Sequence, residues 1–181
     1  MRSRTYKTEG IILQRLNVGE ADRILTVFTK AQGKIRCIAK GVRKPTSRKS
    51  ASIELFNRTT LFIARGRNLD IVTQTEVVES FPKIRKKLKA IKAAYHVVEL
   101  VELLTAQNQE NARVYEPLLS ILRTINKQSH ATRRQISGFE KELLRELGFG
   151  TPKQDSQAAL IQFIESIIEK RLTSIEIFKD I

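Results

Sequence analysis

A short basic segment is the part of this sequence whose residue types and spacing best suit contact with a charged ligand. Residues 40–49 directly follow a stretch in which apolar and basic side chains alternate. Lysine and arginine gathered in this way hold phosphate groups without reading a base sequence. The candidate phosphate-binding residues of the stretch and the segment are Lys34, Arg36, Lys40, Arg43, Lys44, Arg48 and Lys49. They predict contact with nucleic acid, and a solvated loop that only aids solubility is the alternative.

Two further groups of basic residues could extend such a contact. Arg65 and Arg67 flank Gly66 between two expected strands, which would place two guanidinium groups at a barrel rim where single strands commonly cross. A turn that merely needs glycine is the alternative. The second group surrounds the start of an expected helix and consists of Lys83, Arg85, Lys86, Lys87 and Lys89. It predicts either a secondary phosphate track or an ordinary solvated helix face.

Residue types that catalyse reactions or ligate metals do not occur here with suitable spacing. Cys37 is the only cysteine, which excludes a disulfide or a cysteine zinc cage within the sequence. His96 and His130 lack metal-ligand spacing, and Glu20 and Asp22 stand in a turn without an acid/base counterpart. No phosphate-binding glycine motif or nucleophile motif is present. We therefore expect a binding protein that is not an enzyme and needs no cofactor.

The charge of the whole sequence also favours an anionic partner. The net charge is +14 over 181 residues, which creates a potential that attracts polyanions. Residues 1–80 contain 16 basic and 7 acidic residues, against 17 and 12 in residues 81–181, so the first part has the larger excess. No apolar run approaches the roughly 18 residues needed to span a bilayer, and no signal peptide is evident. We expect a cytoplasmic protein that does not contact a membrane.

The elements that must position these residues change character near Pro82. Before it, short runs of β-branched and aromatic residues separated by turn residues predict strands over 6–16, 23–29, 34–40, 53–64 and 69–78. Short strands with no long helix between them favour a small closed barrel. In the third strand, alternation places Ile35, Cys37 and Ala39 on the core side and the basic residues on the other.

After Pro82, apolar residues recur with helical spacing. The first stripe consists of Ile84, Leu88, Ile91, Tyr95 and Val98. Three further stripes lie within 114–125, 136–147 and 160–168, and Asp155 or Ser156 could cap the last helix. The expected fold class is therefore α+β: a β domain over residues 1–80 followed by an all-α helical bundle over residues 81–181.

Several segments resemble the bacterial RecO family of recombination mediators in their order and spacing. They are Tyr6-Lys-Thr-Glu-Gly-Ile-Ile-Leu, Gly19-Glu-Ala-Asp-Arg-Ile-Leu-Thr-Val-Phe-Thr, Gly33-Lys-Ile-Arg-Cys-Ile-Ala-Lys-Gly-Val-Arg and Phe139-Glu-Lys-Glu-Leu-Leu-Arg-Glu-Leu-Gly. The resemblance implies a five-stranded OB-fold barrel followed by a helical domain. It also implies a DNA repair and recombination protein that binds single- and double-stranded DNA, anneals complementary strands and helps load RecA onto DNA coated with single-strand-binding protein.

The resemblance implies partners and one departure as well. The partners are a protein of RecR type, the acidic and apolar tail of single-strand-binding protein and, indirectly, the RecA filament, in a bacterial cytoplasm at the nucleoid. The tail would bind in the helical domain, where Arg113, Arg123 and Arg133 are candidates. Members of the family commonly carry a four-cysteine zinc module after the helix that ends at Leu147-Gly148, and this sequence has no cysteine there. No metal site is therefore expected.

Two other functions fit the same charge and strand pattern. One is an RNA-binding or ribosome-associated OB-fold protein, which a preference for RNA over DNA would favour. The other is an adaptor that recruits proteins without binding nucleic acid. Base stacking on aromatic side chains would support nucleic-acid binding. By their location, the candidates are Tyr6, Phe28, Phe56 and Phe62, although aromatic residues of strands also pack in the core.

Overall fold

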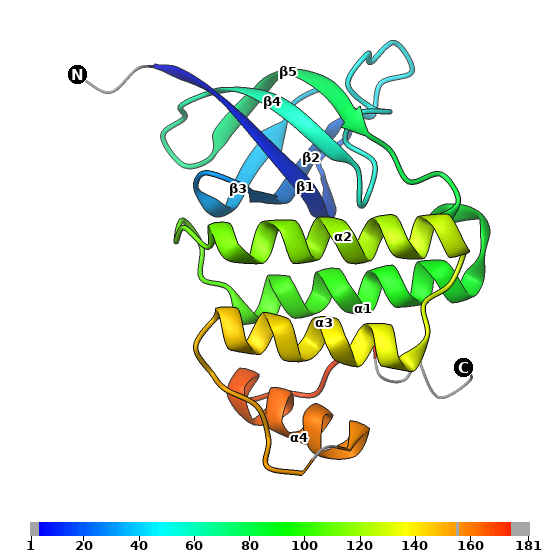
Figure 1. Cartoon of the computed structure of the whole chain (residues 1–181). Helices are drawn as coiled ribbons and strands as arrows, with labels where there is room; N and C mark the ends of the chain where they lie inside the picture. Colours follow the sequence, from blue (N-terminus) through cyan, green and yellow to red (C-terminus); the bar gives the residue numbers. More distant parts are fainter. Residues whose placement is uncertain (1–3, 155, 175–181) are drawn as a thin grey trace. The chain divides into compact units, whose positions relative to one another are not determined.

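The structure, a computed structural model, describes residues 4–154 and 156–174 and divides into two compact units (Figure 1). One unit comprises Met1–Ser80 together with Ala106–Ala112. The other comprises Phe81–Thr105 together with Arg113–Ile181. The chain therefore leaves the first unit after Ser80 and returns to it for the short segment 106–112.

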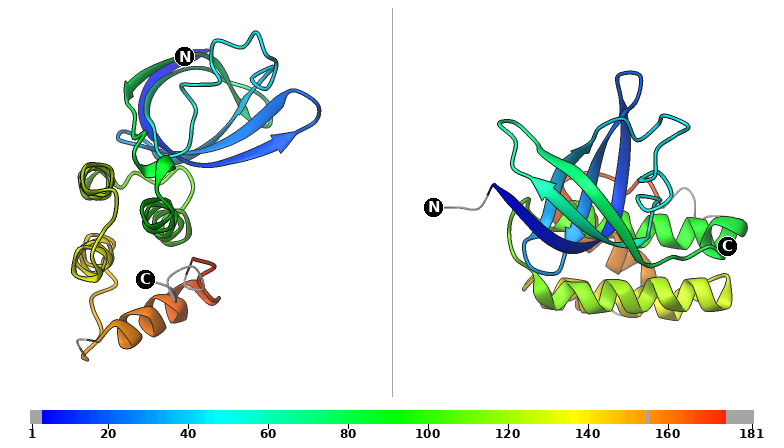
Figure 2. Two further views of the ribbon diagram at one scale, coloured as in Figure 1. Left: turned by 90° about the vertical axis from the view of Figure 1, so that its right-hand side faces the viewer. Right: turned by 90° about the horizontal axis from the view of Figure 1, so that it is seen from above.

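Five strands form a closed barrel in the first unit, which confirms the β fold expected from the sequence. They are β1 (Thr5–Val18), β2 (Asp22–Thr29), β3 (Gly33–Ala39), β4 (Arg58–Ala64) and β5 (Asp70–Glu79). Their order around the barrel is β1-β2-β3-β5-β4, and all neighbours are antiparallel except β3 and β5. The ring and the projecting β1–β2 hairpin are visible in Figure 2. The barrel has the five-stranded architecture of an OB fold.

Alternating side chains of the strands fill the barrel. Ile35, Cys37 and Ala39 point into the core as expected, together with Leu25 and Val27 of β2. Burial, and secondarily the charge of Asp70, raises the pKa of the Cys37 thiol to about 12. The thiol therefore stays protonated and behaves as a small apolar side chain.

The fourth strand begins at Arg58, five residues later than predicted. Residues 53–57 instead lie in turns, although Ile53 and Phe56 are fully buried. The amide of Phe56 donates to the carbonyl of Ile12 at 2.9 Å, and the amide of Ile12 donates to Asn57 at 3.1 Å. These bonds hold the turns against β1. The apolar pattern was correct as a signal of burial, but burial here occurs in turns rather than in a strand.

The returning segment packs against the hairpin that joins β2 and β3. The amide of Asn108 donates to the carbonyl of Lys34 at 2.7 Å, and Gln107 pairs with Lys34 as an isolated parallel bridge. Gly33 has a φ of +65°, and a side chain there would collide with the carbonyl oxygen of Gln109. Glycine is therefore needed at position 33 for both its backbone angle and its lack of a Cβ.

The second unit is helical, as predicted. It contains the 3-10 turn η1 (Ile84–Lys86) and the helices α1 (Leu88–Leu104), α2 (Ala112–Gln128), α3 (Arg133–Glu146) and α4 (Gln157–Ile168). The expected apolar residues of α2 are buried, and so are Ile136, Phe139 and Leu143 of α3. Ser156 caps α4 by accepting a hydrogen bond from the amide of Ala159 at 3.2 Å. Asp155, the other predicted cap, lies outside the described residues.

The predicted start of the first helix is wrong, and its predicted buried face is right only in part, since Ile84 and Val98 are buried. The α-helix begins at Leu88 after an extended Lys87, not at Pro82. Leu88 is 69% exposed and Tyr95 is 41% exposed, whereas Ala90, Ala94 and Val97 are buried. Small alanine side chains form much of the packed face, and a stripe drawn through the largest apolar residues therefore missed part of it.

We predict that Gly33→Ala destabilises the protein by at least about 2 kcal/mol more than Gly19→Ala. Both glycines have positive φ, but nothing lies within 4 Å of a Cβ at Gly19, so only the Gly33 variant adds a collision. Urea unfolding followed by circular dichroism would measure both. Equal destabilisation would show that the backbone angle alone requires glycine at position 33.

Candidate nucleic-acid interface

The basic segment 40–49 is held by turns at the end of β3. The amide of Lys44 donates to Gly41 at 3.2 Å, and the amide of Ser47 donates to Lys44 at 2.9 Å. The segment is also tied to the β1–β2 turn, because the amide of Gly41 donates to the Asp22 carboxylate at 2.7 Å. Within this frame the exposed basic side chains are Lys40, Arg43, Lys44 and Arg48. Arg36 of β3 is exposed as well.

Two of the predicted phosphate-binding residues are engaged in the fold. The ammonium group of Lys49 donates to the carbonyls of Lys40 and Val72, each at 3.2 Å. It thereby connects the end of β3 to β5. Lys34 is only 9% exposed, so the expectation that it stands on an open cationic face is wrong. The main chain beside it is paired with the returning segment 106–112, which the alternation within β3 could not reveal.

A guanidinium cluster, defined here as Arg15, Arg23 and Arg43, lies beside the β1–β2 hairpin. Arg15 pairs with Glu54 at 2.6 Å, and Arg43 donates to the carbonyl of Gly19 at 3.1 Å. The pKa of Arg23 is lowered by burial and then by Arg15 and Arg43, against an opposing effect of Glu54. Among the described residues, Glu54 is paired with this cluster through Arg15, and Arg23 Nε donates to Asn17 Oδ1 at 3.0 Å. An oxyanion such as a phosphate would relieve the mutual repulsion of the three guanidinium groups.

Sequence reasoning missed Arg15 and Arg23. Arg15 was counted within a strand whose apolar residues predicted core, and Arg23 was considered only as an ion-pair partner of Glu20 or Asp22 in the turn, so neither was a candidate for contact with DNA. The sequence did contain a signal for the cluster, because Arg15 and Arg23 flank the turn that Gly19 marks. In the barrel Arg15 lies opposite Leu25, and Arg23 lies opposite Asn17 and Ala39. The turn that joins the two strands therefore brings their basic residues together.

The turn between β4 and β5 carries Arg65 and Arg67, both exposed. A side chain on Gly66 would collide with the carbonyl of Leu69, so the turn also needs glycine. The Arg65 guanidinium lies 4.9 Å from the centroid of the Tyr6 ring, and the Tyr6 hydroxyl donates to Asp70 at 2.7 Å. The turn thus combines two exposed cations with a tightly constrained backbone.

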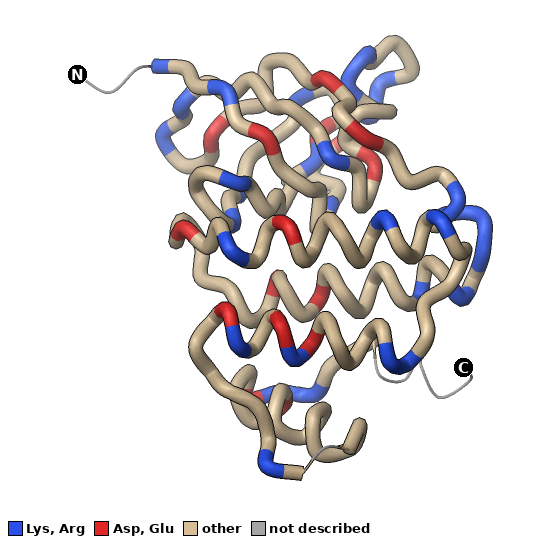
Figure 3. The backbone as a smooth tube through the Cα atoms, in the orientation of Figure 1, with Lys and Arg blue, Asp and Glu red and all other residues tan. Residues whose placement is uncertain are grey.

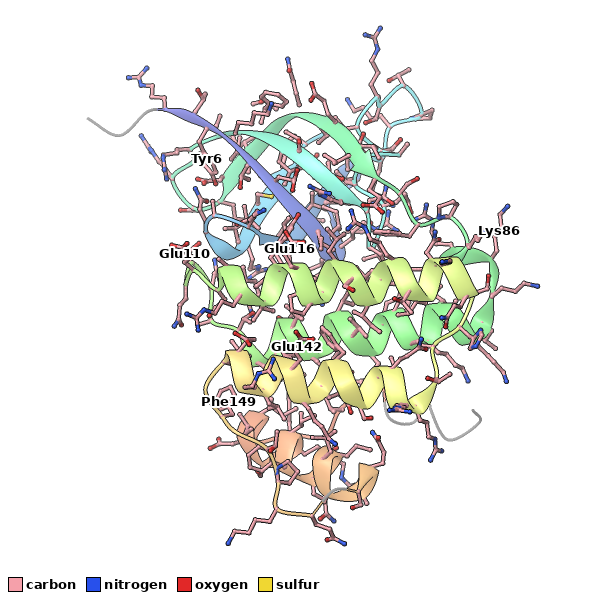
Figure 4. The ribbon with its side chains drawn as sticks, viewed as in Figure 1. Tyr6, Lys86, Glu110, Glu116, Glu142 and Phe149 are labelled. Atoms are coloured by element: carbon pink, nitrogen blue, oxygen red, sulfur yellow. The ribbon has the colours of Figure 1, made fainter. Side chains whose placement is uncertain are left out.

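The second basic group is exposed but does not form a helix face. The group occupies the residue before η1, η1 itself, the extended residue after it and the first turn of α1, and consists of Lys83, Arg85, Lys86, Lys87 and Lys89. The tube of Figure 3 is mostly blue along this stretch, and Lys86 points outward in Figure 4. No acidic residue lies in the first turn of α1, and no side chain caps it. The helix dipole therefore adds to the positive potential of the group.

Hollows of the helical unit lie on α2 and α3. One is lined by residues of both helices, including Ile121, Thr124 and Phe139, and Glu142 lies at its edge. A second involves Lys141, Glu142 and Arg145, where Arg145 already pairs with Glu146 at 3.3 Å. Arg113, Arg123 and Arg133 line neither hollow. Their role in binding the tail of single-strand-binding protein therefore stays a prediction.

A buried polar cluster surrounds His96. Its Nε2 lies 2.7 Å from Glu140 Oε1, and its Nδ1 lies 2.7 Å from Ser174 Oγ. The residue types resemble those of a hydrolase triad, but His96, Glu140 and Ser174 are 3%, 0% and 2% exposed. A substrate has no access to them. The Glu99 carboxylate also accepts from the amides of Thr173 and Ser174, so this network fastens the segment after α4 to α1.

Residues 4–154 and 156–174 contain no group of three or more His, Cys, Asp or Glu that could hold a metal ion. Within the same ranges, no helix combines the length and hydropathy needed to cross a membrane.

Comparisons with known proteins identify relatives along most of the chain. Residues 1–81 match the family described as Recombination protein O N terminal, and residues 85–159 match Recombination protein O C terminal. The chain is 43% identical over 149 residues to DNA repair protein RecO of Roseiflexus sp. (strain RS-1), covering 82% of this chain and 52% of that protein. It is 37% identical over 145 residues to DNA repair protein RecO of Desulforudis audaxviator, covering 80% and 57%. The chain thus spans about half the length of the curated relatives it matches.

We predict that Lys49→Met lowers the free energy of unfolding by about 1–3 kcal/mol, because it removes two hydrogen bonds between strand carbonyls and an ammonium group. Lys44→Met is the matched control: it removes the same charge from an exposed position in the same segment, and we expect a change below about 0.5 kcal/mol. Thermal unfolding of both variants would measure the difference. Equal stability would exclude a structural role for Lys49.

Proposed function

Because the chain belongs to the RecO family of DNA repair proteins, we propose that it binds DNA, anneals complementary strands and helps load RecA onto DNA coated with single-strand-binding protein. These are binding functions, and we propose no catalytic step and no metal cofactor. The observation that most directly supports the proposal is the guanidinium cluster on a closed barrel, since it offers more positive charge than the neighbouring carboxylate neutralises.

The interface that we propose on the barrel differs from the one expected from sequence. It contains the guanidinium cluster, the exposed residues Arg36, Lys40, Lys44 and Arg48, and the turn with Arg65 and Arg67. Lys34 and Lys49 are left out because the first is buried and the second binds main-chain carbonyls. The remaining side chains can reach phosphates, and because contacts to phosphates carry no sequence information, we expect weak sequence preference.

The second basic group is proposed as an additional DNA track. Its exposed lysines precede a helix whose first turn has no acidic residue and no side-chain cap, and phosphates bind favourably to such helix starts. Double-stranded DNA has a higher linear charge density than a single strand. Two separate basic groups could therefore hold different strands, or different parts of one strand.

We also propose protein partners for the mediator role. They are a protein of RecR type, the tail of single-strand-binding protein and, indirectly, the RecA filament, acting in the bacterial cytoplasm near the nucleoid. The basic and apolar surface of the helical unit is the place we assign to the tail. Alanine substitution at Arg113, Arg123 and Arg133 would show which of these arginines contact the tail.

The annealing rate of two complementary oligonucleotides tests the proposal. We predict that the protein accelerates annealing of strands coated with the cognate single-strand-binding protein, and that the acceleration fades as salt rises because phosphate contacts are screened. Fluorescence energy transfer between end labels would follow the reaction. The proposal is wrong if neither bare nor coated strands respond, and a clear preference for RNA of the same length would support the RNA-binding alternative.

We predict that Arg23→Gln combined with Arg43→Gln weakens binding of every single-stranded sequence. The slope of log affinity against log salt should become shallower by about 1.4, because each lost phosphate contact contributes about 0.7. The Arg15–Glu54 pair remains intact in this variant. Lys153→Gln combined with Lys170→Gln removes the same charge from exposed positions of the other unit and should leave the slope unchanged. A double variant of the cluster with an unchanged slope would contradict the assignment.

A further inference from the structure

A shallow hollow lies on the outer side of the barrel, over β1, β4 and β5. Its lining includes Lys7 of β1, Phe62 of β4, and Thr73 and Gln74 of β5. The strand register places Phe62 directly beside Lys7 on one side and beside Gln74 on the other. The Lys7 ammonium lies 5.1 Å from the centroid of the Phe62 ring. An aromatic side chain in a basic, partly polar hollow is the arrangement that binds an unstacked nucleic-acid base.

We infer that this hollow binds one base of a single strand, with Phe62 as the stacking surface and Lys7 as a contact to the adjoining phosphate. The inference rests on the proposed function and adds to it, because the basic residues described above contact only phosphates. The surroundings of Phe62 also distinguish it from the other aromatic residues of the barrel.

The other three aromatic candidates have different roles. Phe28 and Phe56 are buried, at 0% and 1% exposure. Tyr6 also lines the hollow, but it packs against the barrel core and its hydroxyl donates to Asp70. Figure 4 labels Tyr6 near the start of β1. Of the four candidates, Phe62 therefore combines an outward position with a neighbouring hollow.

The lysine over the Phe62 ring does not prevent stacking. At an exposed site a cation and an aromatic ring attract one another weakly, whereas a base stacked on an aromatic ring contributes more. Lys7 is exposed and has a long flexible side chain. A base can therefore displace the ammonium from the ring, and the ammonium then lies within reach of the phosphate of the same nucleotide.

The hollow and the guanidinium cluster lie at different ends of β1. Lys7 and Arg15 are eight residues apart, which corresponds to at most about 26 Å along a strand. A stacked single strand would cover that distance with roughly eight nucleotides. This falls within the range of about 4–16 nucleotides that one OB fold binds. One strand could thus be held by phosphates at one end of the barrel and by a stacked base at the other.

Tryptophan fluorescence tests the inference directly, because the chain contains no tryptophan. In Phe62→Trp, an oligothymidylate of about 16 nucleotides should quench the emission saturably, since a stacked base quenches an indole. Phe149→Trp is the matched control: Phe149 is 42% exposed and lies in the other unit, after α3 (Figure 4). Its emission should not change. Equal quenching of both variants, or quenching of neither, would overturn the inference.

A second variant tests the same contact without introducing a tryptophan into the hollow. Phe62→Leu keeps an apolar side chain but loses the ring, and we expect the affinity for the same oligonucleotide to fall about fivefold to a hundredfold with unchanged thermal stability. Fluorescence anisotropy of labelled oligonucleotide would measure this loss. If the wild-type protein binds and Phe62→Leu binds equally well, only the stacking inference fails. If the wild-type protein binds no DNA at low salt, the proposed function fails first.

Discussion

Closure of the barrel between β3 and β5 is the constraint on which the rest of the first unit depends. The two strands pair only through Cys37 with Asp70 and Ile38 with Ile71 before they separate. Residues between β3 and β4 fill the opening, with Ile53 packed into the core, and the Lys49 ammonium joins the main chain of both strands. The basic segment therefore takes part in linking β3 to β5.

This constraint divides the basic residues of one segment into two groups with different roles. The Lys49 ammonium donates its hydrogen bonds to main-chain carbonyls of the barrel, whereas Lys44 and Arg48 are exposed to solvent. Arg43 contributes to both, since it contacts the β1–β2 turn while its charge lowers the pKa of Arg23. Sequence density of lysine and arginine consequently overstates how many are available to a ligand, and the hydrogen-bond partners decide which ones are.

Particular residues show why some features could be predicted from sequence and others could not. The barrel and helices followed from local periodicity, which burial enforces, as in the inward row of Ile35 and Cys37. The burial of Lys34 depends on a segment more than seventy residues away, and the guanidinium cluster depends on strand register. Neither is encoded within one window of sequence. The buried face of the first helix was predicted only in part for a different reason. Alanine packs well in a helix interface, but it contributes little to an apolar pattern in the sequence.

The chemistry of the barrel surface fits the demands of strand annealing. A protein that anneals strands must hold them while their pairing edges stay accessible, and contacts to phosphates leave those edges free. The outer positions of β2 and β3 include Ile24, Thr26 and Ile38 but no exposed ring, so few bases would be held by stacking. A single platform at Phe62 would fix the position of a strand without sequestering its other bases.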